Sequence, residues 1–336
     1  DDENGNEHRE ASRIAITSAN IAQPANYASL TRRYPLLRDQ GPAEDQDFAV
    51  ALDTALHLVI SQMERMKFDW WNLRTWDQLE DAVAAMGEAD GEMRILGGGQ
   101  SLGPMMNLRL AQPDVVLDLS RVDGLTGIED AGDKLKIGAR VTHARIEDGE
   151  VPGATGAYMQ FVAAGISYRS VRNRGTIGGS VAHSDPSADW PSALLALGGD
   201  VTAVGPNGPR TISLDGFTVG PFTTGLSYDE ILTGFELPVL GVGAAWGYYK
   251  VNRKPGEFAD AIGAVTVGLG PRAVCGATES APFRVPEIEA KLAAGAQEIS
   301  VAEVRDILGG HDAGFDDYEL QIHAVALSRA VKRAFT

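Results

Sequence analysis

The sequence contains one cysteine, Cys275, among 336 residues. A single thiol cannot form an intrachain disulfide, nor can it supply the roughly four cysteine ligands of an iron–sulfur cluster. The six histidines show no HxH or HExxH spacing, so we expect no metal site on this chain. The scarcity of cysteine favours a reducing compartment, and we expect a cytoplasmic protein.

Positive charge is also scarce. Lysine and arginine number 29 against 46 aspartates and glutamates, which gives a net charge of −17. Nucleic-acid binding needs clustered basic residues, so we expect no nucleic-acid partner. No apolar run approaches the roughly 18 residues that span a bilayer, and residues 1–10 are polar and charged, unlike a secretory signal. We therefore expect neither a membrane span nor secretion.

Two familiar nucleotide motifs are missing, yet one glycine-rich stretch stands out. Ile95–Arg109 has the sequence ILGGGQSLGPMMNLR, with three consecutive glycines after a short apolar run. Glycine permits positive φ and close backbone approach, and a series of N–H groups ending in a serine hydroxyl suits a phosphate or pyrophosphate. For an isolated GGG, a plain tight turn between two strands would be the favoured explanation.

A second glycine cluster favours the nucleotide interpretation. Arg174–Asp189 has the sequence RGTIGGSVAHSDPSAD, in which glycines alternate with hydroxyl residues. Neither cluster matches GxxxxGK[ST], and neither is a GxGxxG opening a helix inside a βαβ unit. The pair predicts a different dinucleotide cradle, made mostly of backbone amides and hydroxyls.

Hydrophobic periodicity predicts mixed strands and helices without βαβ regularity, which indicates an α+β fold. The predicted helices are 46–66, a helix from a Thr75 cap through Met86, 142–147 with Thr142 as its cap, 154–164, 189–197, 301–308 and 317–335. The predicted strands are 93–96, 114–119, 135–139, 200–204, 210–212, 230–237, 246–251, 261–269 and 272–275.

The two loops together resemble a known family. The segments GGGQSLGPMMNLRL and RNRGTIGGSVAHSDPSADWP are similar to the FAD-binding medium subunit of the molybdenum hydroxylases, the xanthine dehydrogenase and carbon monoxide dehydrogenase family. DVVLDLSRVDGL, LKIGARVTHARI, GPFTTGLSYDEILTGFELP and YYKVNRKPGEFADAIGAV extend the resemblance. It runs from about Met66 to the C-terminus.

The resemblance implies a domain organisation. Residues 66–238 would form an FAD-binding domain of the PCMH (vanillyl-alcohol oxidase-like) type, with subdomains at about 66–120 and 121–238. A break at Pro238–Gly243 would lead to a smaller α+β domain, 244–336. Residues 1–65 fall outside the resemblance, and we expect a partly helical N-terminal extension of unknown function.

The resemblance also implies cofactor-binding residues, although none that is catalytic. The first loop would contact the pyrophosphate and ribityl chain through Leu96, Gly97, Gly98, Gly99, Gln100, Ser101 and Leu102. The second loop would do so through Thr176, Gly178, Gly179, Ser180 and Ser184. Asp189, Leu232 and Lys250 would lie near the flavin ring.

Each ring neighbour has a simpler explanation. Asp189 could be the N-cap of the helix that follows it, Leu232 a core strand residue, and Lys250 a solvated charge. His183 is expected to be structural or to lie at the ligand edge. Arg169, Arg172 and Arg174 could bind FAD phosphates or an acidic partner, or could be ordinary surface charges.

The function implied is that of a flavoprotein oxidoreductase subunit carrying FAD. Electrons would come from the two [2Fe–2S] clusters of a small partner subunit and pass to an external acceptor. A large partner subunit would hold molybdopterin, and a dimer of such heterotrimers is one arrangement. Two alternatives remain open at this point: a stand-alone FAD-dependent oxidase or dehydrogenase, and a non-catalytic interaction module.

Overall fold

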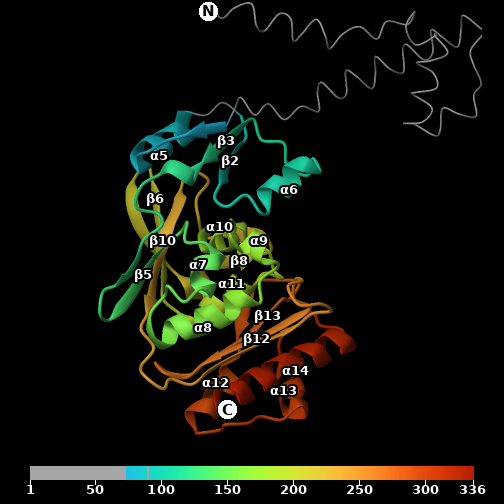
Figure 1. The fold of residues 1–336 in the computed structure, drawn as a ribbon. Helices are drawn as coiled ribbons and strands as arrows, with labels where there is room; N and C mark the ends of the chain where they lie inside the picture. The colour runs from blue at the N-terminus through green and yellow to red at the C-terminus, as the bar shows by residue number, and fades with distance from the viewer. Residues whose placement is uncertain (1–72, 89–90) are drawn as a thin grey trace, which may run out of the picture. The chain divides into compact units, whose positions relative to one another are not determined.

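The computed structural model describes residues 73–88 and 91–336, all of which belong to one unit, Trp70–Thr336. The predicted extension at 1–65, with its helix at 46–66, lies outside the described residues. Within the unit, three sheets are each covered by helices, and a two-stranded ribbon, β8 (Thr218–Gly220) with β9 (Thr223–Thr224), completes the strands described (Figure 1).

The first sheet is parallel and small. Its order is β1 (Leu73–Thr75), β3 (Val115–Asp118) and β2 (Met93–Leu96), with α5 (Leu79–Glu88) and α6 (Leu102–Asn107) as connections. The expected Thr75 cap is wrong, because Thr75 ends a strand and the helix begins at Leu79. In this helix Ala82 and Val83 are buried in a core separate from the main one.

The second sheet is antiparallel, in the order β4 (Ile128–Asp130), β5 (Lys134–Gly138), β10 (Ile231–Pro238), β6 (Asp200–Gly205) and β7 (Gly208–Ser213). Five helices lie between β5 and β6 in the chain. They are α7 (His143–Glu147), α8 (Gly153–Ala164), α9 (Arg169–Arg172), α10 (Ile177–His183) and α11 (Asp189–Leu197). The predicted Thr142 cap is confirmed, since its hydroxyl accepts from the Arg145 amide.

The third sheet is antiparallel and lies between helices on both faces. Its order is β11 (Trp246–Val251), β12 (Ala261–Thr266), β13 (Arg272–Gly276) and β14 (Phe283–Arg284). Helices α12 (Pro286–Ala293), α13 (Val301–Gly309) and α14 (Asp317–Ala334) lie on one side, and α8 and α11 on the other (Figure 1). Alternation along β12 follows from this: Ile262 and Ala264 join the main core, whereas Val265 joins the C-terminal core.

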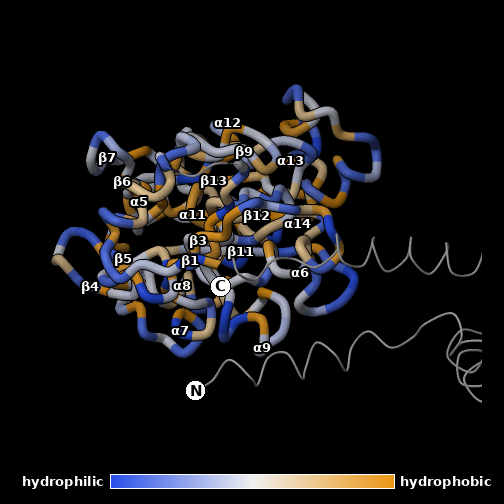
Figure 2. Tube along the Cα trace, turned by 90° about the horizontal axis from the view of Figure 1, so that it is seen from above, coloured by the Kyte–Doolittle hydropathy of each residue, from blue (hydrophilic) through white to orange (hydrophobic). Residues whose placement is uncertain are grey.

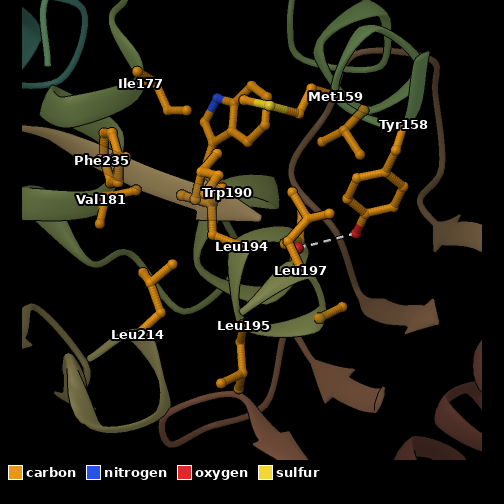
Figure 3. Close-up of a cluster of buried hydrophobic side chains, with 14 of the residues drawn as sticks. Tyr158, Met159, Ile177, Val181, Trp190, Leu194, Leu195, Leu197, Leu214 and Phe235 are labelled. Atoms are coloured by element: carbon orange, nitrogen blue, oxygen red, sulfur yellow. Dashed lines mark hydrogen bonds between the residues drawn. The ribbon is translucent and has the colours of Figure 1, made fainter. Parts of the chain in front are cut away.

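Helix α11 is the centre of the main core. All nine of its residues are buried, and Trp190 is among the largest side chains without solvent exposure. Figure 3 shows Trp190 and Leu194 among side chains from α8, α10 and β10, with the Tyr158 hydroxyl donating to the Ala193 carbonyl. In Figure 2 the hydrophobic segments gather around α11 and β12 and the hydrophilic ones in outlying loops.

The mixed helix-and-sheet fold is confirmed. The main core draws residues from both sides of Pro238–Gly243, including Phe235 and Tyr248, and the predicted domain boundary there stays a prediction. Among the described residues, no helix combines the length and apolar character needed to cross a membrane.

Close packing of α14 on the third sheet depends on glycine. A Cβ built on Gly263 would lie 2.5 Å from the Ala326 carbonyl oxygen. We therefore expect Gly263→Ala to lower the free energy of unfolding by about 1–3 kcal/mol, because the helix must shift away from β12. Urea unfolding of both proteins measures this. Gly241→Ala, where no atom lies within 4 Å of the added carbon, is the control and should change little. Equal stability of the two variants would contradict the packing argument.

Candidate cofactor site

The two glycine loops are in direct contact. The first follows β2, and the second begins at Arg174 and continues through α10, with Thr176 as the N-cap of that helix. A Cβ on Gly98 would lie 2.0 Å from the Arg174 carbonyl oxygen and 2.8 Å from the Gly175 Cα, and one on Gly97 would lie 3.1 Å from the Thr176 hydroxyl. Only glycine allows the backbones to approach so closely. Segments about 75 residues apart in the sequence thus form one site.

The first loop presents unused hydrogen-bond donors. The amides of Gly98, Gly99, Gln100 and Ser101 donate to no other described residue, whereas the carbonyls of Gly99 and Ser101 accept bonds that begin α6. Ser101 occupies the N-cap position without forming a side-chain cap bond. Gly98 and Gly99 are half-buried, whereas Gln100 and Ser101 are exposed, so a ligand can reach this stretch of backbone. Four consecutive free amides and a free hydroxyl therefore suit an anionic ligand.

The second loop differs, because most of its amides are occupied within the protein. The Ile177, Gly178 and Ser180 amides donate to the carbonyls of Val141, Ala139 and Thr176, and the Gly179 amide donates to the Thr176 hydroxyl. A Cβ on Gly178 would lie 2.5 Å from that of Ala139, so Gly178 serves packing. What remains for a ligand is the O–H of Thr176 and the half-buried hydroxyl of Ser180.

The remaining first- and second-loop residues have structural surroundings. Leu96 ends β2 and Leu102 begins α6. Ser184 is buried, adopts a φ of 52° at the end of α10, and its carbonyl accepts from the Phe222 amide. His183, just before it, is half-buried with its ring centroid 5.1 Å from that of Phe222. Its role stays a prediction.

Asp189, Tyr248 and Lys250 form a buried network between α11 and β11. The Tyr248 hydroxyl donates to Asp189 Oδ1 at 2.6 Å, and Lys250 Nζ lies 3.1 Å from Oδ2 and 2.8 Å from the Gly165 carbonyl oxygen. The expected alternatives for two of these residues are wrong. The N-cap of α11 is Ala188 rather than Asp189, and Lys250, with a side chain only 9% exposed, is not a solvated charge.

Burial and hydrogen bonding shift the pKa of Asp189 in opposite directions. Burial raises the pKa of Asp189, while the charge of Lys250 and the Tyr248 hydrogen bond act in the opposite direction. Burial and the neighbouring carboxylate both raise the pKa of Tyr248, which keeps the phenol protonated. An ammonium group has three N–H donors, so one donor of Lys250 remains for a ligand.

Lys250 also lines a pocket of about 310 Å³, together with Gly165, Tyr248, Arg333, Phe161, Val162 and Ala164. Leu232, the third predicted ring neighbour, is 5% exposed and belongs to the main hydrophobic core. The core interpretation therefore describes its surroundings, and its contact with a flavin stays a prediction. Cys275 is fully buried.

The three arginines Arg169, Arg172 and Arg174 differ in whether their own chain pairs them. Arg169 forms ion pairs with Glu147 and Asp148, and Arg172 pairs with Glu147 and donates to two carbonyls. These two arginines are held by their own chain. Arg174 forms no ion pair with any described residue, and the charge of Arg174 contributes to the lowered pKa of Arg140. Of the three, only Arg174 is available for an anion.

Sequence reasoning missed His143. Its ring lies under the second loop, where a Cβ on Gly175 would meet it at 2.9 Å, and Trp190 Nε1 donates to its Nδ1 at 3.1 Å. Burial, with a smaller contribution from Arg172, lowers the pKa of His143 to about 4. The only signal in the sequence was its place directly after the Thr142 cap. No group of three or more potential metal ligands occurs within the described ranges.

Comparison with known proteins identifies the fold. Residues 66–240 match the family model described as the FAD binding domain in molybdopterin dehydrogenase. The chain belongs to this family. It is an oxidoreductase subunit with FAD as its cofactor, as the sequence predicted.

Individual relatives agree. The nicotine 6-hydroxylase medium subunit of Paenarthrobacter nicotinovorans is 37% identical over 74% of this chain and 84% of its own length. The carbon monoxide dehydrogenase structure from Hydrogenophaga pseudoflava superposes with a TM-score of 0.73 at 30% identity, covering 79% of this chain and 96% of that one. The structure of quinoline 2-oxidoreductase from Pseudomonas putida 86 superposes with a TM-score of 0.69 at 26% identity, covering 78% of this chain and 96% of that one.

The neutral state of His143 predicts acid sensitivity. The pKa is held below its ordinary 6.5, so the stability from this residue is complete above pH 6.5 and is lost as the pH falls through about 4. The shift corresponds to roughly 3 kcal/mol. His143→Gln keeps an acceptor for Trp190 and removes the titration. Unfolding free energy measured between pH 7 and 4 should fall less in this variant, and identical slopes would contradict the assignment.

Proposed function

We propose that the first loop binds the pyrophosphate of FAD, and that the second loop holds the first in place by packing against it. The observation that carries this is the set of four unused amides from Gly98 to Ser101, with the Ser101 hydroxyl beside them. The Thr176 and Ser180 hydroxyls and the unpaired Arg174 supply further donors on the second loop. Hydrogen bonds to charged oxygens are stronger than neutral ones, so a few such groups suffice for tight binding.

We further propose that the flavin ring lies in the pocket beside Lys250. Gly165, whose carbonyl accepts from Lys250, begins the segment that passes through α9 to Arg174 and the second loop. The pocket and the loops are therefore linked by a short stretch of chain. FAD supplies the redox chemistry when bound, whereas the protein residues bind it, orient it and set the local charge.

The chain would act within a complex. We propose that it accepts electrons from [2Fe–2S] clusters of a small subunit and passes them to an external acceptor, while a large subunit holds molybdopterin. Relatives named medium subunit or medium chain support this arrangement, as does the single cysteine of the sequence, since a cluster needs about four cysteine ligands. A heterotrimer, a cytoplasmic location, a PCMH-type domain at 66–238 and a second domain at 244–336 belong to the same proposal.

Visible absorption of the protein purified with its partners tests the function. We expect flavin bands that are released as FAD on denaturation, plus iron–sulfur absorbance from accompanying chains. Substrate-dependent bleaching of the isolated chain would instead favour a stand-alone flavoenzyme. A colourless protein that takes up no added FAD would overturn both and leave an interaction module.

The placement of the pyrophosphate has its own test. Ser101→Ala removes a hydroxyl that forms no hydrogen bond with any described residue, and we expect FAD affinity to fall about tenfold by loss of one charge-assisted hydrogen bond. Gly98→Ala should lower FAD affinity by a larger factor, since its Cβ would push the two loops apart. Gly103→Ala, with no atom within 4 Å of the added carbon, is the control. Fluorescence titration with FAD measures all three, and unchanged affinity in Ser101→Ala and Gly98→Ala would remove the placement.

A further inference from the structure

The pocket beside Lys250 includes a residue from the C-terminal helix. Phe161, Val162, Ala164 and Gly165 form an apolar wall at the end of α8, β11 contributes Tyr248 and Lys250, and α14 contributes Arg333. Its volume of about 310 Å³ is at the lower end of the range for small-molecule sites, and it combines a mainly apolar lining with a few polar groups.

The two cations of the pocket are not equivalent. Lys250 is paired with the buried carboxylate of Asp189, so its charge is largely compensated. Arg333 forms no ion pair with any carboxylate in the part of the chain that the structure describes. The net positive charge of the pocket therefore comes from Arg333 on α14. In the sequence, this helix is far from both glycine loops.

Arg333 is held in a defined place. Its Nη1 donates to the Tyr248 carbonyl oxygen at 2.9 Å, and its guanidinium lies 4.6 Å from the Tyr249 ring centroid and 5.7 Å from that of Phe161. Cation–π contacts and a backbone acceptor together limit the motion of the side chain. The charge is therefore fixed at the pocket wall even though the residue is exposed.

We propose that Arg333 makes the bound flavin easier to reduce by stabilising negative charge on the ring. The inference rests on the proposed function, because it requires the flavin ring to occupy this pocket. Addition of two electrons and one proton to the neutral oxidised ring gives a monoanion. A fixed cation at the pocket wall lowers the energy of that product more than that of the neutral ring.

The experiment uses the full chain loaded with FAD, titrated with dithionite against a redox dye. At a fixed dye potential, Arg333→Gln should lower the ratio of reduced to oxidised flavin about tenfold, and added salt should narrow the difference from wild type. Arg333→Lys should restore most of the ratio. Arg329→Gln is the matched control, because Arg329 lies 4.9 Å from the same Tyr249 ring but does not line the pocket.

The outcomes separate the two proposals. FAD retained with an unchanged ratio in Arg333→Gln would overturn the role of Arg333 and leave the proposed function standing. An equal effect of Arg329→Gln would also overturn it, because the effect would then be one of helix packing. Failure of the wild-type chain to hold FAD would overturn the proposed function, and this inference with it.

Discussion

The close approach of Gly98 to the Arg174 carbonyl is the contact on which the site depends. It joins a small parallel sheet, which carries the first loop, to the helices α9 and α10, which carry the second. The second loop uses most of its amides in hydrogen bonds within the protein, whereas four amides of the first loop donate to no described residue. One loop thus acts as support and the other as the binding surface. Backbone donors positioned in this way need no rearrangement to receive an anion.

A second constraint operates where α11 meets β11. Asp189 begins a fully buried helix, where its carboxylate pairs with Lys250 and accepts a hydrogen bond from Tyr248, both from the third sheet. Removing one partner of a buried pair leaves an uncompensated charge, so the network holds α11 and β11 in a fixed relation. Tyr248 and Lys250 also line the pocket, so the network fixes this part of its wall. Arg333 adds a further positive charge from α14. Parts of the chain far apart in sequence therefore share one site.

The sequence predicted most elements because their patterns are local. The strands at 93–96 and 246–251 and the helix at 189–197 have the predicted bounds. Helices α6 and α10 were missed, since their glycines disfavour helix. Bonds to the carbonyls of Val141 and Ala139 and burial in the main core hold α10 in place. Both loops were found, but their unequal roles depend on bonds to Ala139 and Val141, which no motif encodes. His143 and Arg333 were missed for the same reason: their significance arises from packing between distant segments.

Hydrogen exchange of the full chain, followed by mass spectrometry with and without FAD, tests the central claim most directly. Four amides that have no partner among the described residues should exchange fast without the cofactor. Peptides covering residues 98–101 should then become protected when FAD is added, while the occupied amides of 177–180 change little. Bound FAD with no protection at 98–101 would contradict the account, because the pyrophosphate would then lie elsewhere.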